Sequence, residues 1–114
     1  MEQHIRESIQ RFVVIGISHQ TCPVDTREKF HIAQKAKDRI FGEAQQYGLK
    51  AVIPVSTCNR TEIYACTGDS ELITYLFTKY TQASLEEFVT HGYVYKGQSA
   101  IRHLLLYAAT KQFD

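Results

Sequence analysis

The stretch AVIPVSTCNRTEIYACT, residues 51–67, decides the fold that this sequence predicts. Its first part, Ala51–Val55, is apolar and rich in β-branched residues, and its last part, Thr61–Thr67, alternates weakly between apolar and polar residues. Each part therefore predicts a strand. Pro54 cannot donate a ladder hydrogen bond, so it indicates a strand end, an edge or a bulge. The polar residues 56–60 are expected to connect the two strands.

Upstream of this strand pair, the sequence predicts one strand and one helix. The run Phe12–Ser18 is short, apolar and β-branched, which is typical of a buried strand. Apolar side chains recur at three- or four-residue steps from Ala33 to Tyr47 and predict one apolar helical face of a helix over residues 25–47. Asp25 and Glu28 have the spacing of an acidic capping box and indicate the start of this helix, and Gly48 is a plausible C-cap.

Downstream, residues 70–82 predict a second helix, 85–89 a short helical turn and 93–95 a fourth strand. A last helix is expected from about residue 100 to 110, with Ser99 as its cap. The apolar face of this helix is expected to be formed by Ile101, Leu104, Leu105 and Ala108. His103 lies roughly opposite that face at 100° per residue, so it is expected to face solvent or line a cleft rather than the core.

The order of the predicted elements indicates the fold class. The first six follow the split β-α-β-β-α-β order of the ferredoxin-like class. We therefore expect an α+β fold, in which an antiparallel sheet carries helices on one face and a C-terminal helix is added.

Composition limits the function classes that are open. The 114 residues suffice for one domain, and 13 Lys and Arg against 12 Asp and Glu give a net charge of +1. This balance indicates no marked affinity for polyanions. The three cysteines lack zinc-type spacing, so no metal site is expected. No apolar run approaches the ~18 residues of a membrane span. A cytoplasmic protein that binds no membrane is the expectation.

The polar connection carries the residues most suited to chemistry. Cys58 lies there among polar neighbours, whereas a structural cysteine normally lies within an apolar run. Arg60 is two residues away, and a nearby cation favours the thiolate, which is the nucleophilic form. An incidental thiol, with Arg60 in solvent or paired with Glu62, is the simpler interpretation from composition alone.

Three segments resemble motifs of the glutamyl-tRNA reductase family. Residues 56–65, STCNRTEIYA, resemble the cysteine signature of that family. Residues 16–24, GISHQTCPV, followed by Arg27-Glu28, resemble its N-terminal motif. AIRHLL, which begins at Ala100, is similar to a helical motif centred on a histidine. After that histidine, residues 110–114 depart from the family pattern.

The resemblance implies a mechanism and a set of site residues. Cys58 would attack the ester that joins glutamate to the tRNA 3′ end and form a glutamyl-thioester. Hydride from NADPH would then release glutamate-1-semialdehyde, a precursor in tetrapyrrole synthesis. Arg60 would hold the glutamate carboxylate, and His103 would orient the ester or assist proton transfer. Beside the resemblance, Thr57 and Asn59 flank Cys58 and are candidates to hydrogen-bond the substrate or the developing oxyanion. A purely structural bond within the turn is the alternative for both residues.

The resemblance also implies cofactors and partners. Residues 1–114 would form the N-terminal catalytic domain, and the NADPH-binding and dimerisation domains of the family would lie outside this chain. No G-x-G-x-x-G loop is present, so no cofactor is expected to bind these residues. The expected partners are the acceptor end of glutamyl-tRNA, a second copy held through the dimerisation domain, and a downstream aminomutase.

Two other functions stay open on the residues alone. The first is a non-catalytic ferredoxin-like module for binding or regulation, which the near-neutral charge slightly favours. The second is a cysteine-dependent hydrolase, for which a histidine base would have to lie near Cys58, and His103 is the best candidate.

Overall fold

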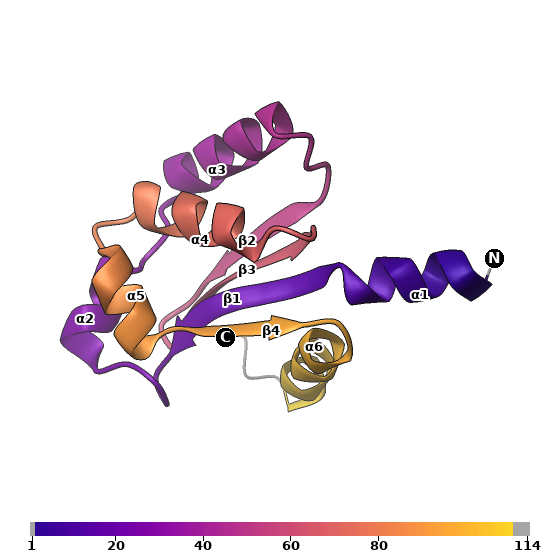
Figure 1. The fold of residues 1–114 in the computed structure, drawn as a ribbon. Helices are drawn as coiled ribbons and strands as arrows, with labels where there is room; N and C mark the ends of the chain where they lie inside the picture. The colour runs from indigo at the N-terminus through magenta and orange to yellow at the C-terminus, as the bar shows by residue number, and fades with distance from the viewer. Residues whose placement is uncertain (1, 111–114) are drawn as a thin grey trace.

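The computed structural model describes residues 2–110, and the side chains of residues 2–107. Its sheet contains four strands: β1 (Phe12–Ser18), β2 (Val52–Ser56), β3 (Arg60–Cys66) and β4 (Tyr93–Lys96). The strand order is β2-β3-β1-β4, and every neighbouring pair is antiparallel. This is the order that the split β-α-β-β-α-β pattern requires, so the predicted fold class is confirmed (Figure 1).

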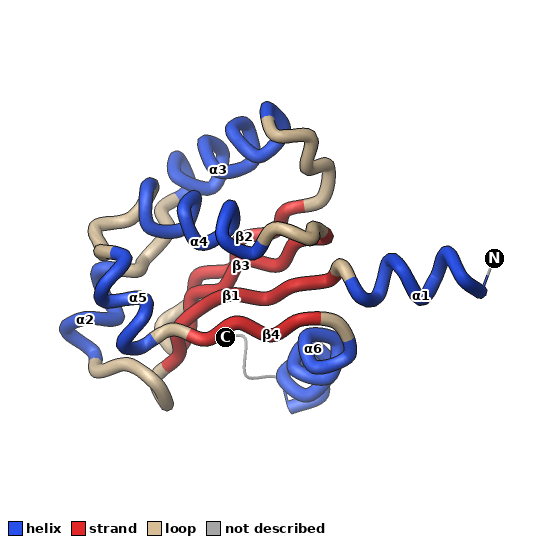
Figure 2. The backbone as a smooth tube through the Cα atoms, in the orientation of Figure 1, coloured by secondary structure: helices blue, strands red, loops and turns tan. Residues whose placement is uncertain are grey.

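Helices lie on both faces of this sheet. The helices of the described residues are α1 (Glu2–Gln10), α2 (Val24–Lys29), α3 (Gln34–Gln46), α4 (Ser70–Lys79), α5 (Leu85–His91) and α6 (Gln98–Thr110). Figures 1 and 2 show α3 and α4 side by side over one face, α6 across the other, and α1 extending away from the sheet. Among the described residues, no helix is both long and apolar enough to cross a membrane.

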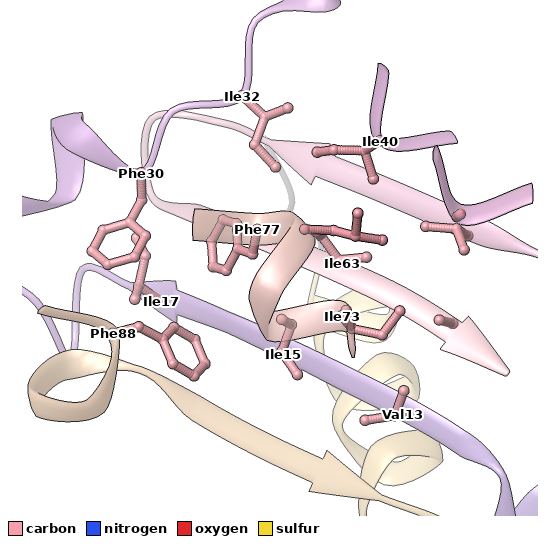
Figure 3. Close-up of a cluster of buried hydrophobic side chains, with 14 of the residues drawn as sticks. Val13, Ile15, Ile17, Phe30, Ile32, Ile40, Ile63, Ile73, Phe77 and Phe88 are labelled. Carbon is pink, nitrogen blue, oxygen red and sulfur yellow. The ribbon is translucent and has the colours of Figure 1, made fainter. Parts of the chain in front are cut away.

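The main core lies between the sheet and the α3–α4 layer. Alternate residues of the central strands, including Ile15, Ile17 and Ile63, point into it (Figure 3). The aromatic rings of Phe30 and Phe77 meet at 5.3 Å between centroids. Because nearly all of these side chains are inaccessible to solvent, this layer provides most of the hydrophobic stabilisation.

The helix predicted over residues 25–47 is wrong as one continuous element. The structure has two helices, α2 and α3, separated by residues 30–33. Phe30 and Ile32 are both fully buried in the main core. Residues two positions apart point about 200° apart on a helix, but they point to the same side of an extended segment. Because both side chains are buried in the same core, the chain is extended there and the helix is interrupted. The capping role of Asp25 is also wrong, since α2 begins after Pro23 without a side-chain cap.

The predicted orientation of the last helix is wrong for Leu105 and His103. Leu105 is 62% exposed, whereas His103 is 8% exposed and faces the sheet beside the fully buried Ala100. The buried face of α6 is therefore formed by Ala100 and His103, with Leu104 partly buried against the cluster of Val14 and Tyr64. The side chain of Ala108 lies outside those that the structure describes. Ser99 lies inside α6 and is not its cap. Gly48 ends α3, as predicted, but it lies one residue beyond the C-cap, Tyr47, with φ +83.

A glycine in β1 provides a test of the sheet packing. A Cβ at Gly16 would lie 2.5 Å from the carbonyl oxygen of Thr61, a backbone atom that cannot turn aside. We expect Gly16→Ala to lower the free energy of unfolding by about 1–3 kcal/mol, measured by urea denaturation. Gly42→Ala is the matched control: nothing lies within 4 Å there, so an α3 alanine is expected to stabilise by about 0.5–1 kcal/mol. Equal effects of both changes would contradict this packing.

Candidate active site around Cys58

Cys58 and Asn59 form the tip of the hairpin between β2 and β3. Ser56 pairs with Thr61 in the ladder, and the Thr57 N–H donates to the Arg60 carbonyl at 2.8 Å. The chain therefore reverses over two residues, and both are exposed. A thiol at the tip of a short hairpin is presented to solvent on a backbone that the sheet holds firmly.

The hydroxyl of Thr57 holds this turn together. Its Oγ1 accepts the N–H groups of Asn59 and Arg60 and lies within donating distance of the Arg60 carbonyl, each at 3.3 Å. A hydroxyl has one donor and two acceptor sites, so these contacts use its full capacity. Of the two roles that the sequence left open for Thr57, this geometry favours the structural one.

The hairpin tip is also tied to the loop after β1. The His19 N–H donates to the Asn59 carbonyl at 2.8 Å, which joins the first family-like motif to the second. None of the described residues hydrogen-bonds the side-chain amide of Asn59. That amide therefore remains available as a donor beside the thiol.

A cavity of about 580 Å³ opens next to the thiol. Its walls come from α2, the segment after α2 and the hairpin, and are formed by Val24, Arg27, Glu28, His31, Thr57, Cys58, Asn59 and Thr61. The cavity thus places one guanidinium and one carboxylate near the thiol. Sequence reasoning singled out the Arg27-Glu28 pair only as part of a motif and gave it no chemical role.

His31 is a wall residue that sequence reasoning missed. Its Nδ1 lies 3.1 Å from Ser56 Oγ, which also accepts the Ile32 N–H and lies 3.3 Å from Thr61 Oγ1. These bonds fix the imidazole ring from its Nδ1 side and leave Nε2 as the ring nitrogen for an incoming group. No periodicity marks His31, because it lies in the irregular segment between two helices.

Arg27 is held in place by the loop before α2. Its Nη1 donates to the Cys22 carbonyl at 2.9 Å. The Cys22 thiol itself is buried, and burial raises its pKa despite the opposing effect of Arg27. The third cysteine, Cys66, is exposed at the opposite end of β3 from the hairpin. Cys58 is thus the one cysteine among residues 2–110 that lines this cavity.

Arg60 and His103 do not line the cavity. Successive residues of a strand face opposite sides, and Arg60 points to the face of the sheet that α6 covers. Its guanidinium is fully buried, lies 3.6 Å from the centroid of the Tyr107 ring and places Nη1 3.3 Å from Glu62 Oε2. The cation that lines the cavity of Cys58 is therefore Arg27, not the Arg60 that proximity in sequence suggested.

Glu62 is the centre of this second cluster and is inaccessible to solvent. Its carboxylate accepts hydrogen bonds from the hydroxyls of Tyr64, at 2.5 Å, and Tyr93, and from His103 Nε2 at 2.5 Å. Burial by itself raises the pKa of Glu62, but the hydrogen bonds from His103, Tyr64 and Tyr93 outweigh it, so the pKa lies below its ordinary value. Through these hydrogen bonds the cluster connects α6 and β4 to Glu62 on the central strand β3.

Comparison with known proteins places the chain in a family. Residues 15–110 match the family model described as "Glutamyl-tRNAGlu reductase, N-terminal domain". The chain belongs to this family. Two relatives named glutamyl-tRNA reductase, from Lawsonia intracellularis and Christiangramia forsetii, are 37% and 32% identical over 96% and 91% of the chain.

The chain spans about a quarter of the length of these glutamyl-tRNA reductases, with 24% and 25% of their residues covered. A solved glutamyl-tRNA reductase from Methanopyrus kandleri superposes with a TM-score of 0.63 over 87% of the chain and 22% of that protein, at 24% identity. That match supports the fold. The family-like motifs at the loop after β1 and at the hairpin are the two that meet beside Cys58.

Proposed function

We propose that this member of the glutamyl-tRNA reductase family accepts a glutamyl group from its tRNA on the sulfur of Cys58. The observation that carries the proposal is the placement of Cys58: an exposed thiol at a rigid hairpin tip, opening into a cavity with a cation, a carboxylate and an imidazole. The relatives named glutamyl-tRNA reductase support the choice of acyl donor.

The proposed step balances without any further reactant. The Cys58 thiolate attacks the ester carbonyl carbon, a C–S bond forms, and the bond from that carbon to the ribose oxygen breaks. The ribose oxygen leaves with the electron pair and takes up a proton, so the products are a glutamyl-thioester and tRNA. That proton is the one that the thiol releases when it becomes the thiolate. An aminoacyl ester is already activated, and the thiolate fraction of a cysteine at neutral pH is strongly nucleophilic, so no strong base is required. Asn59 is positioned to donate to the developing oxyanion, and His31 to pass the proton.

The charges of the cavity match a glutamyl ester. That group carries a side-chain carboxylate and an α-ammonium, and the cavity walls carry Arg27 and Glu28. A guanidinium recognises a carboxylate through paired hydrogen bonds. We therefore assign the carboxylate to Arg27. The family resemblance implies Arg60 instead, but Arg60 already contacts Glu62 and Tyr107 beneath α6.

The fold does not fit the NADPH that the resemblance implies as hydride donor. No two neighbouring strands among the described residues are parallel, and a dinucleotide site is built on a parallel β-α-β unit with a glycine-rich turn. Gly16 lies within β1 against the backbone of β3 and forms no such turn. No step proposed for these residues runs through NADPH. Dimerisation, delivery to an aminomutase and cytoplasmic localisation stay predictions about the whole protein.

The direct test is transfer of label from glutamyl-tRNA carrying radioactive glutamate. The chain is mixed with it, precipitated and separated under denaturing conditions. We expect protein-bound label that hydroxylamine removes, because hydroxylamine cleaves thioesters. If the label stays on the RNA and the three thiols react equally fast with an alkylating reagent, a non-catalytic binding module would be favoured.

Arg27→Gln tests how the glutamyl group is recognised. Loss of one charged hydrogen-bond partner is worth about 1.5–3 kcal/mol, so acylation of Cys58 by glutamyl-tRNA should slow by about ten- to a hundredfold. Acylation by tRNA carrying a neutral amino acid should change little. Arg102→Gln, a cation on the exposed side of α6, is the control. An equal slowing with both acyl groups would show that Arg27 supports the cavity but does not read the carboxylate.

A further inference from the structure

A second groove runs along the same side of the molecule as the cavity of Cys58. It encloses about 510 Å³ and is bounded by α3, the segment before it and the end of α4. Its walls are Glu28, Lys29, His31, Ala33, Lys35, Ala36, Arg39, Lys79, Tyr80, Thr81 and Gln82. Glu28 and His31 belong to both hollows, so the groove continues directly from the cavity.

Four cations line this groove, and two of them are not neutralised. Lys29 pairs with Glu87 at 2.9 Å and Lys79 with Glu43 at 2.6 Å. Lys35 and Arg39 are exposed and form no ion pair with any residue between 2 and 110. They lie four residues apart on α3, so their side chains are neighbours on one helix face, about 5–6 Å apart at Cβ. The groove thus presents two adjacent positive charges on α3 and one exposed carboxylate, Glu28, where it joins the cavity, although the net charge of the chain is only +1.

We propose that this groove binds the sugar-phosphate backbone of the RNA strand whose aminoacylated 3′ end lies beside Cys58. The inference rests on the proposed function, because an acyl ester in the cavity fixes where the RNA strand ends. The nucleotides before that end must leave through an open side of the cavity, and the groove is continuous with it. Phosphates meet Lys35 and Arg39 there. Such contacts are independent of base sequence and sensitive to salt.

The test compares two double charge reversals in the full chain. K35E/R39E removes the cations of the groove, and K50E/R102E makes the same change in net charge at two exposed residues outside it. Binding of fluorescently labelled, unacylated glutamate-accepting tRNA is followed by anisotropy at several salt concentrations. We expect K35E/R39E to weaken binding at least about tenfold and to reduce the slope of log K against log salt by about 1.5. K50E/R102E should weaken binding less than about twofold.

Two outcomes would overturn the inference: no binding by the unmodified chain, or equal weakening by both double variants. A second measurement separates it from the proposed function, namely acylation of Cys58 by a small activated ester of glutamate that contains no RNA. K35E/R39E should accept this ester at the unmodified rate. If no variant is acylated by the ester or by glutamyl-tRNA, the proposed function fails, while tRNA binding still decides the groove.

Discussion

Cys58→Ser is expected to abolish formation of the glutamyl-thioester, with the rate of transfer from glutamyl-tRNA falling by about a thousandfold or more. The replacement leaves an oxygen almost where the sulfur was, so the shape of the hairpin is retained. A serine hydroxyl, however, remains protonated at neutral pH and is a weak nucleophile without a dedicated base. The measurement is the amount of hydroxylamine-labile label on the protein per unit time.

Cys66→Ser is the matched control for this prediction. Cys66 is also an exposed thiol, and it lies at the other end of β3 from the hairpin. We expect this variant to accept the glutamyl group at the unmodified rate. If Cys66→Ser lost as much activity as Cys58→Ser, or if Cys58→Ser were still labelled, the hairpin thiol would not be the acceptor.

The sheet was predictable because each strand carries a recognisable pattern within its own few residues. Residues 12–18 and 51–67 carry β-branched or alternating patterns bounded by polar residues, and the order of elements then left one ferredoxin-like arrangement. The break after α2 was not predictable from periodicity. Phe30 and Ile32 fit an apolar helix by composition, and only their shared burial in the core shows that the chain is extended there.

The site was predictable only in part, and for a physical reason. Cys58 lies in a polar turn, so its exposure followed from the sequence. Arg60 is two residues away but begins a strand, where alternate residues point to opposite faces. Thr61 and Ile63 share the face of the main core, so the register already places Arg60, with Glu62, on the α6 face. The face of α6 that His103 occupies depends on Glu62, a partner 41 positions away, which no helical periodicity reveals.

The buried cluster gives α6 a structural dependence on one carboxylate. Arg60, Tyr93 and His103 come from β3, β4 and α6, and all three bind Glu62. Tyr107 of α6 covers the Arg60 guanidinium. The cluster and the cavity of Cys58 meet in the hairpin, where the Arg60 N–H donates to the hydroxyl of Thr57. A defect in the cluster should therefore appear first as a loss of stability.

Glu62→Gln is expected to lower the free energy of unfolding by about 3–5 kcal/mol, since it leaves the buried Arg60 guanidinium without its carboxylate. That is a large part of the roughly 5–15 kcal/mol that holds an ordinary domain folded. Urea denaturation at neutral pH is the measurement. Glu2→Gln removes the carboxylate of an exposed ion pair with Arg6 and is the control. We expect it to leave the midpoint of urea denaturation without a measurable change.

The dependence on pH separates loss of this charge from a simple packing defect. Because the pKa of Glu62 is lowered in the folded state, its ionisation stabilises the fold above the unfolded pKa, about 4.3. This stabilisation is lost as the pH falls through the lower, folded pKa. The unmodified chain should therefore lose stability steeply over that acidic range, and Glu62→Gln should lose less there, so the two curves converge. Parallel curves from pH 7 down to the acid limit would show that the charge of Glu62 does not hold α6 on the sheet.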